Sequence, residues 1–309
     1  MSPRVRFALI VLAIAAAVPV AWRLFLAEEP TPPVVLAPPP NAAPAVVDAG
    51  AHAVEIHLGE VTGAVQIRRG ATGEWLDAKS GDALQPSDGV RTLDGSYAVL
   101  VGEETWEVKM EPGTEVGIGE LKETISQLLL ETGMAKATVK GRHTFEVRTA
   151  NSDAVARTDG GVFTIASNGR GTVAVGTEQG EVSLSGAGRV VIVRAGQQSL
   201  VKPGQGPSEP VTIPSSLLLK VALPTKKTVN TPKLELEGAV EPGSLVEVQG
   251  HIVAVDEQGR FKVPVTLKEG KNTLTVRARG VGGQETRAGG AVELDTTVKA
   301  PTIDKNLWK

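Results

Sequence analysis

The sequence predicts a mainly β protein with an N-terminal transmembrane helix and two β-rich modules. The chain has 35 glycines, 20 prolines and only 3% aromatic residues, and the segments between the glycines are rich in valine and threonine. This composition favours short strands joined by turns. An uncharged apolar segment lies near the N-terminus, and 309 residues suffice for an anchor and two domains.

Composition excludes several functions. Charged residues make up 22% of the chain and the net charge is -3, so no broad basic field is available to attract nucleic acid. The chain has no cysteine, which excludes disulfides, thiolate metal sites, cysteine nucleophiles and a lipoprotein anchor. Export remains possible without disulfides, and the sequence signal for it lies at the N-terminus.

Residues 1–27 are predicted to be a signal anchor. Arg4 and Arg6 precede an uncharged segment from Phe7 to Trp22, and the apolar span from Phe7 to Ala27 reaches the roughly 20 residues that cross a bilayer. The two arginines would keep the N-terminus in the cytoplasm. We expect a single-pass protein of the bacterial inner membrane, contacting the bilayer through residues 7–27, with its bulk in the periplasm.

Cleavage of this segment is the open alternative. A cut after Ala17 would satisfy the preference for small residues at cleavage sites through Ala15 and Ala17. The product would be a released periplasmic or extracellular protein.

Residues 28–53 are predicted to be a proline-rich linker. Seven prolines between Glu28 and Gly50 favour extended polyproline II and oppose helix or sheet formation. We interpret this segment as a spacer between the membrane and the domains.

Residues 54–207 are predicted to form the first β domain. Short apolar–polar alternation broken by glycine indicates strands with one buried face, and a spacing of about eight to twelve residues suggests a sandwich, barrel or short β-roll. The expected strands are residues 64–68, 97–101, 105–109, 144–148, 161–165, 172–175, 180–184 and 189–193.

One soluble helix is expected between these strands, from Glu120 to Glu131. Its apolar residues Leu121, Ile125, Leu128 and Leu129 share a face at helical spacing, and Gly133 would end it. We favour a helix that caps the β core over one that docks a partner.

A series of short motifs runs in order through this domain, at residues 63–68, 80–84, 88–92, 98–100, 145–150, 156–163, 175–182 and 195–198. Their order resembles that of the FecR domain, named for the regulator of ferric-citrate transport. The resemblance covers roughly Gly59 to Pro207. One local departure is the segment from Arg157 to Gly161 before Phe163, where the family usually has Arg-Gly-Thr.

This resemblance implies an envelope interaction domain. The best-known members also control a sigma factor through a cytoplasmic N-terminal segment, but only about six residues precede the apolar span here. Such a stub is too short for an anti-sigma fold, so direct sigma control by this chain is not expected.

Residues 208–300 are predicted to form a second β domain, followed by a tail at 301–309. Its motifs at residues 246–250, 255–261 and 267–274 resemble those of bacterial immunoglobulin-like domains, which implies a β-sandwich. Asp256 and Asn272 are expected to shape turns, with calcium binding as the weaker alternative. The expected strands are residues 233–238, 245–248, 252–255, 260–265 and 272–277.

No catalytic, cofactor or metal site is predicted. His52, His57, His143 and His251 are scattered without metal spacing and are interpreted as solvated or turn residues. The candidate carboxylates Glu103, Glu104 and Glu107 suit a solvated rim. Trp75 and Trp106 could stack on a sugar but are expected in the core. Trp308, next to the charged C-terminus, is expected either to anchor to a partner or to be frayed.

The leading functional hypothesis is a non-catalytic scaffold that binds an envelope protein or a cell-wall polymer and needs no cofactor. The alternative is a signal-transduction regulator coupled to a sigma factor through a separate membrane partner. Both hypotheses depend on the anchor, the spacer and two modules that lack recognisable catalytic residues. The sequence makes no prediction of the ligand, the binding surface or the oligomeric state.

Overall fold

The computed structural model describes residues 55–102, 105–122, 125–141 and 143–297. The chain divides into Met1–Gly50 and Ala51–Lys309, and all described residues belong to the second unit. The predicted anchor at 1–27 and the predicted linker at 28–53 therefore lie outside the described residues. Within the described part of the chain, no helix is long and apolar enough to cross a membrane.

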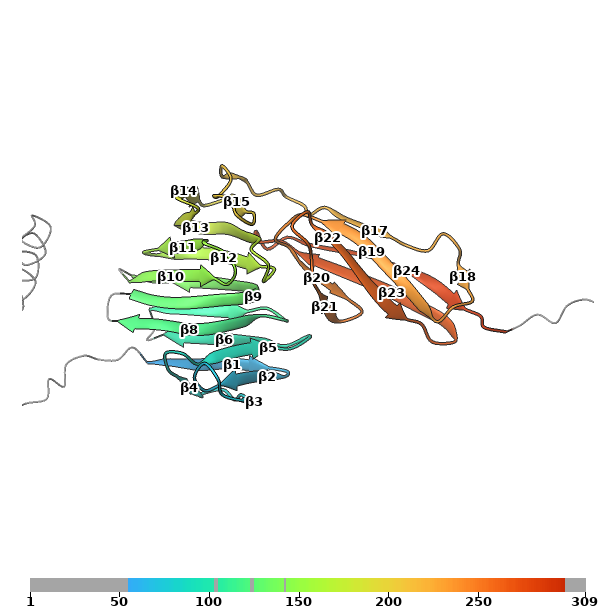
Figure 1. Ribbon diagram of the computed structural model, residues 1–309, viewed down its shortest axis with the longest axis horizontal. Helices are drawn as coiled ribbons and strands as arrows, with labels where there is room; N and C mark the ends of the chain where they lie inside the picture. The colour runs from blue at the N-terminus through green and yellow to red at the C-terminus, as the bar shows by residue number, and fades with distance from the viewer. Residues whose placement is uncertain (1–54, 103–104, 123–124, 142, 298–309) are drawn as a thin grey trace, which may run out of the picture. The chain divides into compact units, whose positions relative to one another are not determined.

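The first β module comprises strands β1 to β16, which hydrogen bond into one continuous system (Figure 1). Most strands predicted from residues 64 to 193 are confirmed. The strands are β1 Ile56–Thr62, β2 Val65–Arg68, β3 Trp75–Asp77, β4 Ala83–Leu84, β5 Gly89–Thr92, β6 Tyr97–Gly102, β7 Trp106–Met110, β8 Glu115–Lys122, β9 Ile125–Val139, β10 Thr144–Thr149, β11 Val155–Thr158, β12 Gly161–Ser167, β13 Val173–Gly186, β14 Arg189–Arg194, β15 Gln197–Val201 and β16 Val211–Thr212.

These strands form two layers that share β9 and β13. The first half of β9 pairs with β8 and β10, and its second half pairs with β7 and β12. In the same way, β13 pairs first with β12 and β15 and then with β11 and β14. One layer therefore runs from β4 through β1, β6, β7, β9, β12, β13 and β15 to β16, and the other from β3 through β2, β5, β8, β9, β10, β11 and β13 to β14. This arrangement is a short β-roll, one of the predicted alternatives.

Both shared strands change layer at an irregularity. In β9, Leu128 and Leu130 face the core before the irregularity, but Ala135 and Ala137 do so after it. The register with β8 shifts between Glu115 and Val116, so one residue of β9 is left over and the inward face switches. A matching shift in the β12–β13 pairing accompanies the bend of β13.

An aromatic group fills the centre of the core between the two layers. The rings of Trp106 and Phe145 are 5.1 Å apart, and those of Phe145 and Phe163 are 6.3 Å apart. All three side chains are almost fully buried. Aliphatic residues from every long strand surround them, and this packing holds the layers together.

The predicted helix from Glu120 to Glu131 is wrong. The segment ends β8 and begins β9, where Ser126, Leu128 and Leu130 are buried and their neighbours only partly so. Three leucines in succession fit both a helical and an alternating pattern. The segment forms a strand because β8 and β10 pair with it on either side.

Gly133, predicted to end that helix, lies inside β9. Its φ is +96°, and a Cβ atom here would approach the Cα of Thr114 to 2.5 Å. Only glycine fits both the backbone conformation and this close contact. The residue thus belongs to the bend between layers.

The strands predicted at residues 172–175 and 180–184 are one strand, β13. Gly180, the first residue of the second predicted strand, has φ +77° and lies within β13 at its change of layer. Glycine inside a strand often marks a bulge, so the glycine did not mark a strand end here.

The second β module comprises β17 to β24 and packs two sheets around its own apolar core. One sheet has the order β17-β19-β22 and the other β18-β24-β23-β20-β21. The predicted strand at 252–255 is displaced to β21, and the others are confirmed. The strands are β17 Leu219–Ala222, β18 Thr228–Val229, β19 Lys233–Val240, β20 Leu245–Val248, β21 His251–Val253, β22 Arg260–Thr266, β23 Gly270–Arg279 and β24 Glu285–Leu294.

A small apolar cluster joins the two modules. Met134, Ala166 and Ala174 lie on the outer face of the first module and are buried because Val281 and Leu245 of the second module pack against them. Gly176 permits the approach, since a Cβ there would lie 2.6 Å from the carbonyl oxygen of Val281. The tight contact places polar groups of both modules beside one another.

Candidate functional site

Asp88, in the motif at residues 88–92, holds a turn of the first module. Asp88 accepts hydrogen bonds from the backbone N–H groups of Gly70 and Gln85 and from Arg69, at 2.8 to 3.0 Å. Burial opposes ionisation, but these donors outweigh it and the pKa of Asp88 lies below its ordinary value. This motif aspartate therefore has a structural role.

Glu111 brings a carboxylate to the contact between the modules. It follows β7 directly, and its backbone is fixed by bonds to the Met134 carbonyl and from the Thr92 hydroxyl. The residue is 8% exposed. Its side chain pairs with Arg279 of the second module. A buried carboxylate needs such a partner, because desolvation of an unpaired charge is costly.

Arg279 belongs to a hairpin that presents several charges on one face. In the β23–β24 register, Arg279 is opposite Glu285 and Arg277 is opposite Arg287. Alternation along the strands therefore places all four side chains on the same side of the hairpin. This group was not predicted from the sequence, although two arginines before a glycine-rich turn and Glu285 and Arg287 after it are a pattern that indicates such a hairpin.

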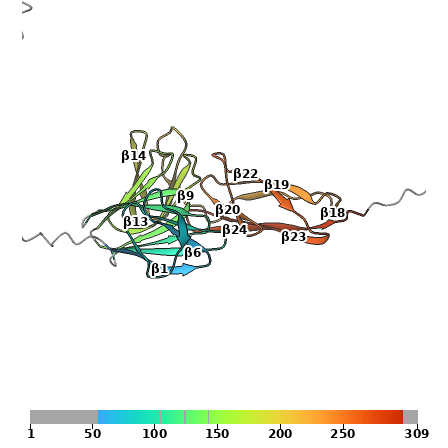
Figure 2. The same ribbon diagram turned by 60° about the horizontal axis from the view of Figure 1, so that its bottom comes forward.

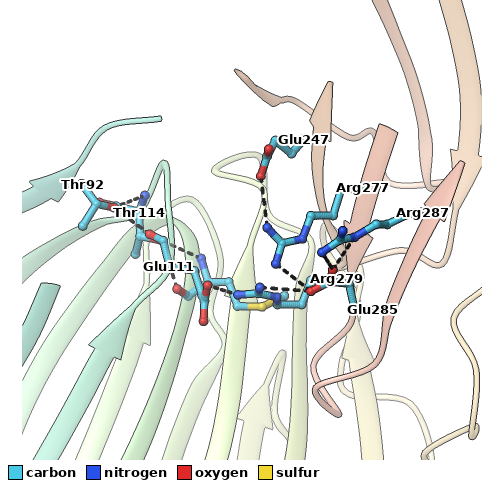
Figure 3. Close-up of polar contacts among 9 residues, drawn as sticks. Thr92, Glu111, Thr114, Glu247, Arg277, Arg279, Glu285 and Arg287 are labelled. Carbon is cyan, nitrogen blue, oxygen red and sulfur yellow. Dashed lines mark hydrogen bonds and ion pairs between the residues drawn. The ribbon is translucent and has the colours of Figure 1, made fainter. Parts of the chain in front are cut away.

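Glu285 is the centre of the resulting network (Figure 3). Its carboxylate accepts hydrogen bonds from Arg277 at 2.7 Å, Arg287 at 2.9 Å and Arg279 at 3.3 Å. The bond from Arg277 is the largest cause that lowers the pKa of Glu285 to about 2. Arg279 is thus shared between two carboxylates, Glu285 on its own module and Glu111 on the other.

A second polar contact joins the modules through Asp94. Its carboxylate lies 2.8 Å from Nδ1 of His251 and accepts a 2.8 Å hydrogen bond from the backbone N–H of Ile252. His251 remains 75% exposed at its side chain, in agreement with the prediction of a solvated residue. Asn168 adds a further bond by donating to the carbonyl of Val255.

A cavity of about 470 Å³ lies beside the ion-pair network. Lys109 and Lys136 line it from adjacent strands, where they are direct cross-strand partners. Lys136 pairs with Glu178 at 2.8 Å, and Lys109 lies 5.2 Å from the centre of the Tyr97 ring. The cavity therefore has mixed charge, and Glu107, one of the candidate carboxylates, contributes to its exposed wall.

A serine–histidine pair lies in the core. The hydroxyl of Ser126 is 2.9 Å from Nε2 of His143 and accepts a 3.0 Å bond from Nε1 of Trp106. Ser126 is fully buried and His143 is 7% exposed. The interpretation of His143 as solvated is therefore wrong, because it satisfies a buried hydroxyl. The core role predicted for Trp106 is confirmed.

Trp75, in contrast, is not a core residue. It lies on the short strand β3, partly exposed, with the guanidinium of Arg91 4.3 Å and that of Arg68 4.9 Å from its ring centre. The prediction failed because Trp75 shares the outward face of its layer with these arginines. Their cation–π contacts give Trp75 a structural role on this surface.

The turn interpretation of Asp256 and Asn272 is confirmed. Asp256 accepts from the N–H groups of Gln258 and Arg260, and Asn272 bonds the backbone of Lys268 and Gly270. Among the described residues, no group of three or more histidine, cysteine or acidic side chains could hold a metal ion. The candidates His52, Glu103, Glu104 and Trp308 lie outside the described residues.

We expect the ion-pair network to weaken in acid. The pKa of Glu285 falls from 4.5 to about 2 in the folded protein, so its ion pairs stabilise the fold above pH 4.5 and this stabilisation is lost as pH falls towards 2. Thermal melting between pH 7 and pH 2 should show the loss. In Glu285→Gln the melting temperature should be lower at pH 7 and its decline between pH 4.5 and 2 smaller.

Glu293→Gln is the matched control on the same strand, because Glu293 is exposed and makes no side-chain bond in the described structure. It should keep the decline of the unaltered protein. An equally steep decline in Glu285→Gln would contradict the role of Glu285.

No protein-family model and no curated protein matches the chain. Among solved structures, a candidate anti-sigma factor from Parabacteroides distasonis is similar with 21% identity and a TM-score of 0.35, covering 40% of this chain. The chain spans 58% of that protein's length. The fibronectin(III)-like modules of Clostridium thermocellum CbhA are similar with 14% identity and a TM-score of 0.22, over 58% of this chain and 93% of theirs. The fold is therefore defined by the strand pairing of this chain.

Proposed function

We propose that the chain is a non-catalytic, FecR-like regulator of the bacterial envelope that acts in signal transduction through a separate membrane partner. It would be held at the inner membrane by residues 7–27, with both β modules in the periplasm and the second an immunoglobulin-like sandwich. The observation that carries the proposal is the position of Arg279, which is shared between Glu111 of the first module and Glu285 of the second.

The motif residues support the FecR-like part of the proposal. The aspartate and glycine motifs of the sequence coincide with turns between strands, as at Asp88, or with the start of strands, as at Gly89. Their contacts are internal to the fold, which fits residues that specify a β-roll and leaves its outer faces for partners. Recognition is therefore assigned to surface side chains and strand edges.

The ion-pair network supports the regulatory part. In a regulator, binding at one surface must change the state of another surface. This coupling requires an element with two arrangements whose relative free energy depends on binding. Arg279 can keep Glu285 as a partner when it leaves Glu111, so the contact between the modules can open without leaving the arginine unpaired. Glu111 would then be exposed to water and would no longer need a cation.

We expect deletion of the gene to change the abundance of a defined set of transcripts in the bacterium that encodes the chain. Restoring the unaltered protein should reverse this change. Restoring Arg279→Gln should leave the same set altered, because the contact between modules is weakened while the rest of the fold remains. Transcript sequencing of the four strains makes the comparison.

Glu120→Gln is the matched control, because Glu120 pairs only with Lys122 at an exposed site. An unchanged transcriptome in the deletion strain would contradict regulation. The scaffold hypothesis is then the second candidate, favoured by an open groove of about 840 Å³ that Lys220 and Arg170 line together with Lys262 and Arg260. Co-sedimentation of the protein with peptidoglycan, together with an unchanged transcriptome, would favour that reading.

A further inference from the structure

Strand β14 forms a free edge of the first module. Its six residues, from Arg189 to Arg194, pair with β13 on one side, and no strand of the described chain pairs with the other (Figure 2). Val191 and Val193 face the core. Val190 is 61% exposed and Ile192 is 38% exposed, so the outward face of this edge is aliphatic.

Most of the other strands that end a layer or a sheet in the described chain are short or carry proline or lysine. Edge strands β3, β4, β16, β18 and β21 have only two or three residues. Strand β22 is longer, but it carries Lys262 and Pro264, and β17 carries Lys220. Short length, proline and lysine are the usual devices that prevent an edge from pairing with another chain. Between its terminal arginines, β14 has none of these devices.

The surroundings of β14 favour a strand as the ligand. Ile192 lies opposite Ser183, and Val190 lies opposite Ser185. Because both serine side chains are small, there is space above Val190 and Ile192 for the side chains of an added strand. An added strand would continue the β13–β14 ladder with main-chain hydrogen bonds. Its own outward side chains would pack against Val190 and Ile192 as cross-strand neighbours.

The charges at the ends of β14 select the partner. Arg189 and Arg194 pair with Glu209 and Glu181 at sites where all four side chains are 48% to 79% exposed, so these pairs contribute little and can be replaced. Two copies of β14 in antiparallel register would place arginine opposite arginine at both ends. Like charges directly opposite destabilise a strand pair, which disfavours a second copy of this chain.

We propose that β14 is a strand-addition site for an extended segment of a partner protein, with alternating aliphatic residues between two acidic ends. This surface deepens the proposed function, because it supplies the place where a regulator would hold its partner. Its test measures direct binding, whereas the test of regulation measures transcripts, so either can fail without the other.

The test uses full-length protein in mild detergent and two labelled synthetic peptides of about ten residues in which valine and threonine alternate. One peptide ends in glutamates and the other in lysines, and fluorescence anisotropy measures their affinities. The acidic peptide should bind at least about tenfold more tightly at low salt, and the difference should shrink as salt is added. In the double variant Arg189→Glu, Arg194→Glu the preference should reverse.

Ile192→Lys should weaken binding of the acidic peptide by about fivefold or more, because it adds the edge protection that β22 already has. Val211→Lys is the matched control at another exposed aliphatic residue of the first module and should bind normally. Equal melting temperatures of the two variants would show that the fold is intact.

Equal affinity for both peptides, no binding of the acidic one, or unchanged binding by Ile192→Lys would overturn the proposal. Sedimentation velocity gives a further check. A dimer that Ile192→Lys abolishes would also overturn it, in favour of pairing between two copies of the chain.

Discussion

Phe145→Ala is expected to lower the free energy of unfolding by about 3–5 kcal/mol, the usual cost of removing a buried aromatic side chain. Phe145 is fully buried between the rings of Trp106 and Phe163. It lies on β10, between the neighbouring strands β9 and β11, so the cavity would open in the middle of the module. Urea unfolding at equilibrium measures the loss.

Val190→Ala is the control for this experiment, since the side chain is largely exposed and should change the free energy of unfolding by no more than about 0.5 kcal/mol. Phe145→Leu should cost less than Phe145→Ala because it leaves a smaller cavity. A loss below about 1 kcal/mol in Phe145→Ala would mean that the aromatic group does not organise the core.

Arg279→Gln is expected to lower the free energy of unfolding by about 2–3 kcal/mol. The substitution leaves the Glu111 carboxylate nearly buried without its cation, whereas Glu285 keeps Arg277 and Arg287. The figure lies below the usual cost for a fully buried pair because the Arg279 side chain is 21% exposed. Urea unfolding with Glu111→Gln and the double variant completes a cycle that measures the coupling.

The double variant should be more stable than Arg279→Gln alone, because it removes the unpaired charge. Glu120→Gln supplies the control, since its pair with Lys122 is exposed and should contribute less than about 1 kcal/mol. Additive effects of the two single substitutions would show that Glu111 and Arg279 are not coupled in solution.

The strands were largely predictable from the sequence, whereas their continuity was not. Alternation correctly located β6 and β7, where one face is buried in the core and the other is partly or fully exposed. It failed in β9 because a bulge near Glu131 shifts the phase of alternation and three leucines in succession imitate a helix. A pattern of fixed period cannot represent a strand that changes sides.

Individual side chains of the site were harder to predict than strands. His143 and Ser126 are 17 residues apart in the sequence. Ser126 lies on β9 and His143 directly precedes β10, and the parallel pairing of these strands brings the two side chains together. Glu111 and Arg279 are 168 residues apart, and neither module alone gives a reason for their pairing. The hairpin charges around Glu285 were predictable in principle, because their register follows from one short turn.

The two strands that belong to both layers also constrain how the first module can fold. Both β9 and β13 pair with strands of each layer. Neither layer can therefore form all of its strand pairs before β9 and β13 are in position. The parallel pairing of β9 with β10 adds a non-local step, which slows folding. The two layers should therefore acquire amide-exchange protection together, as one cooperative unit.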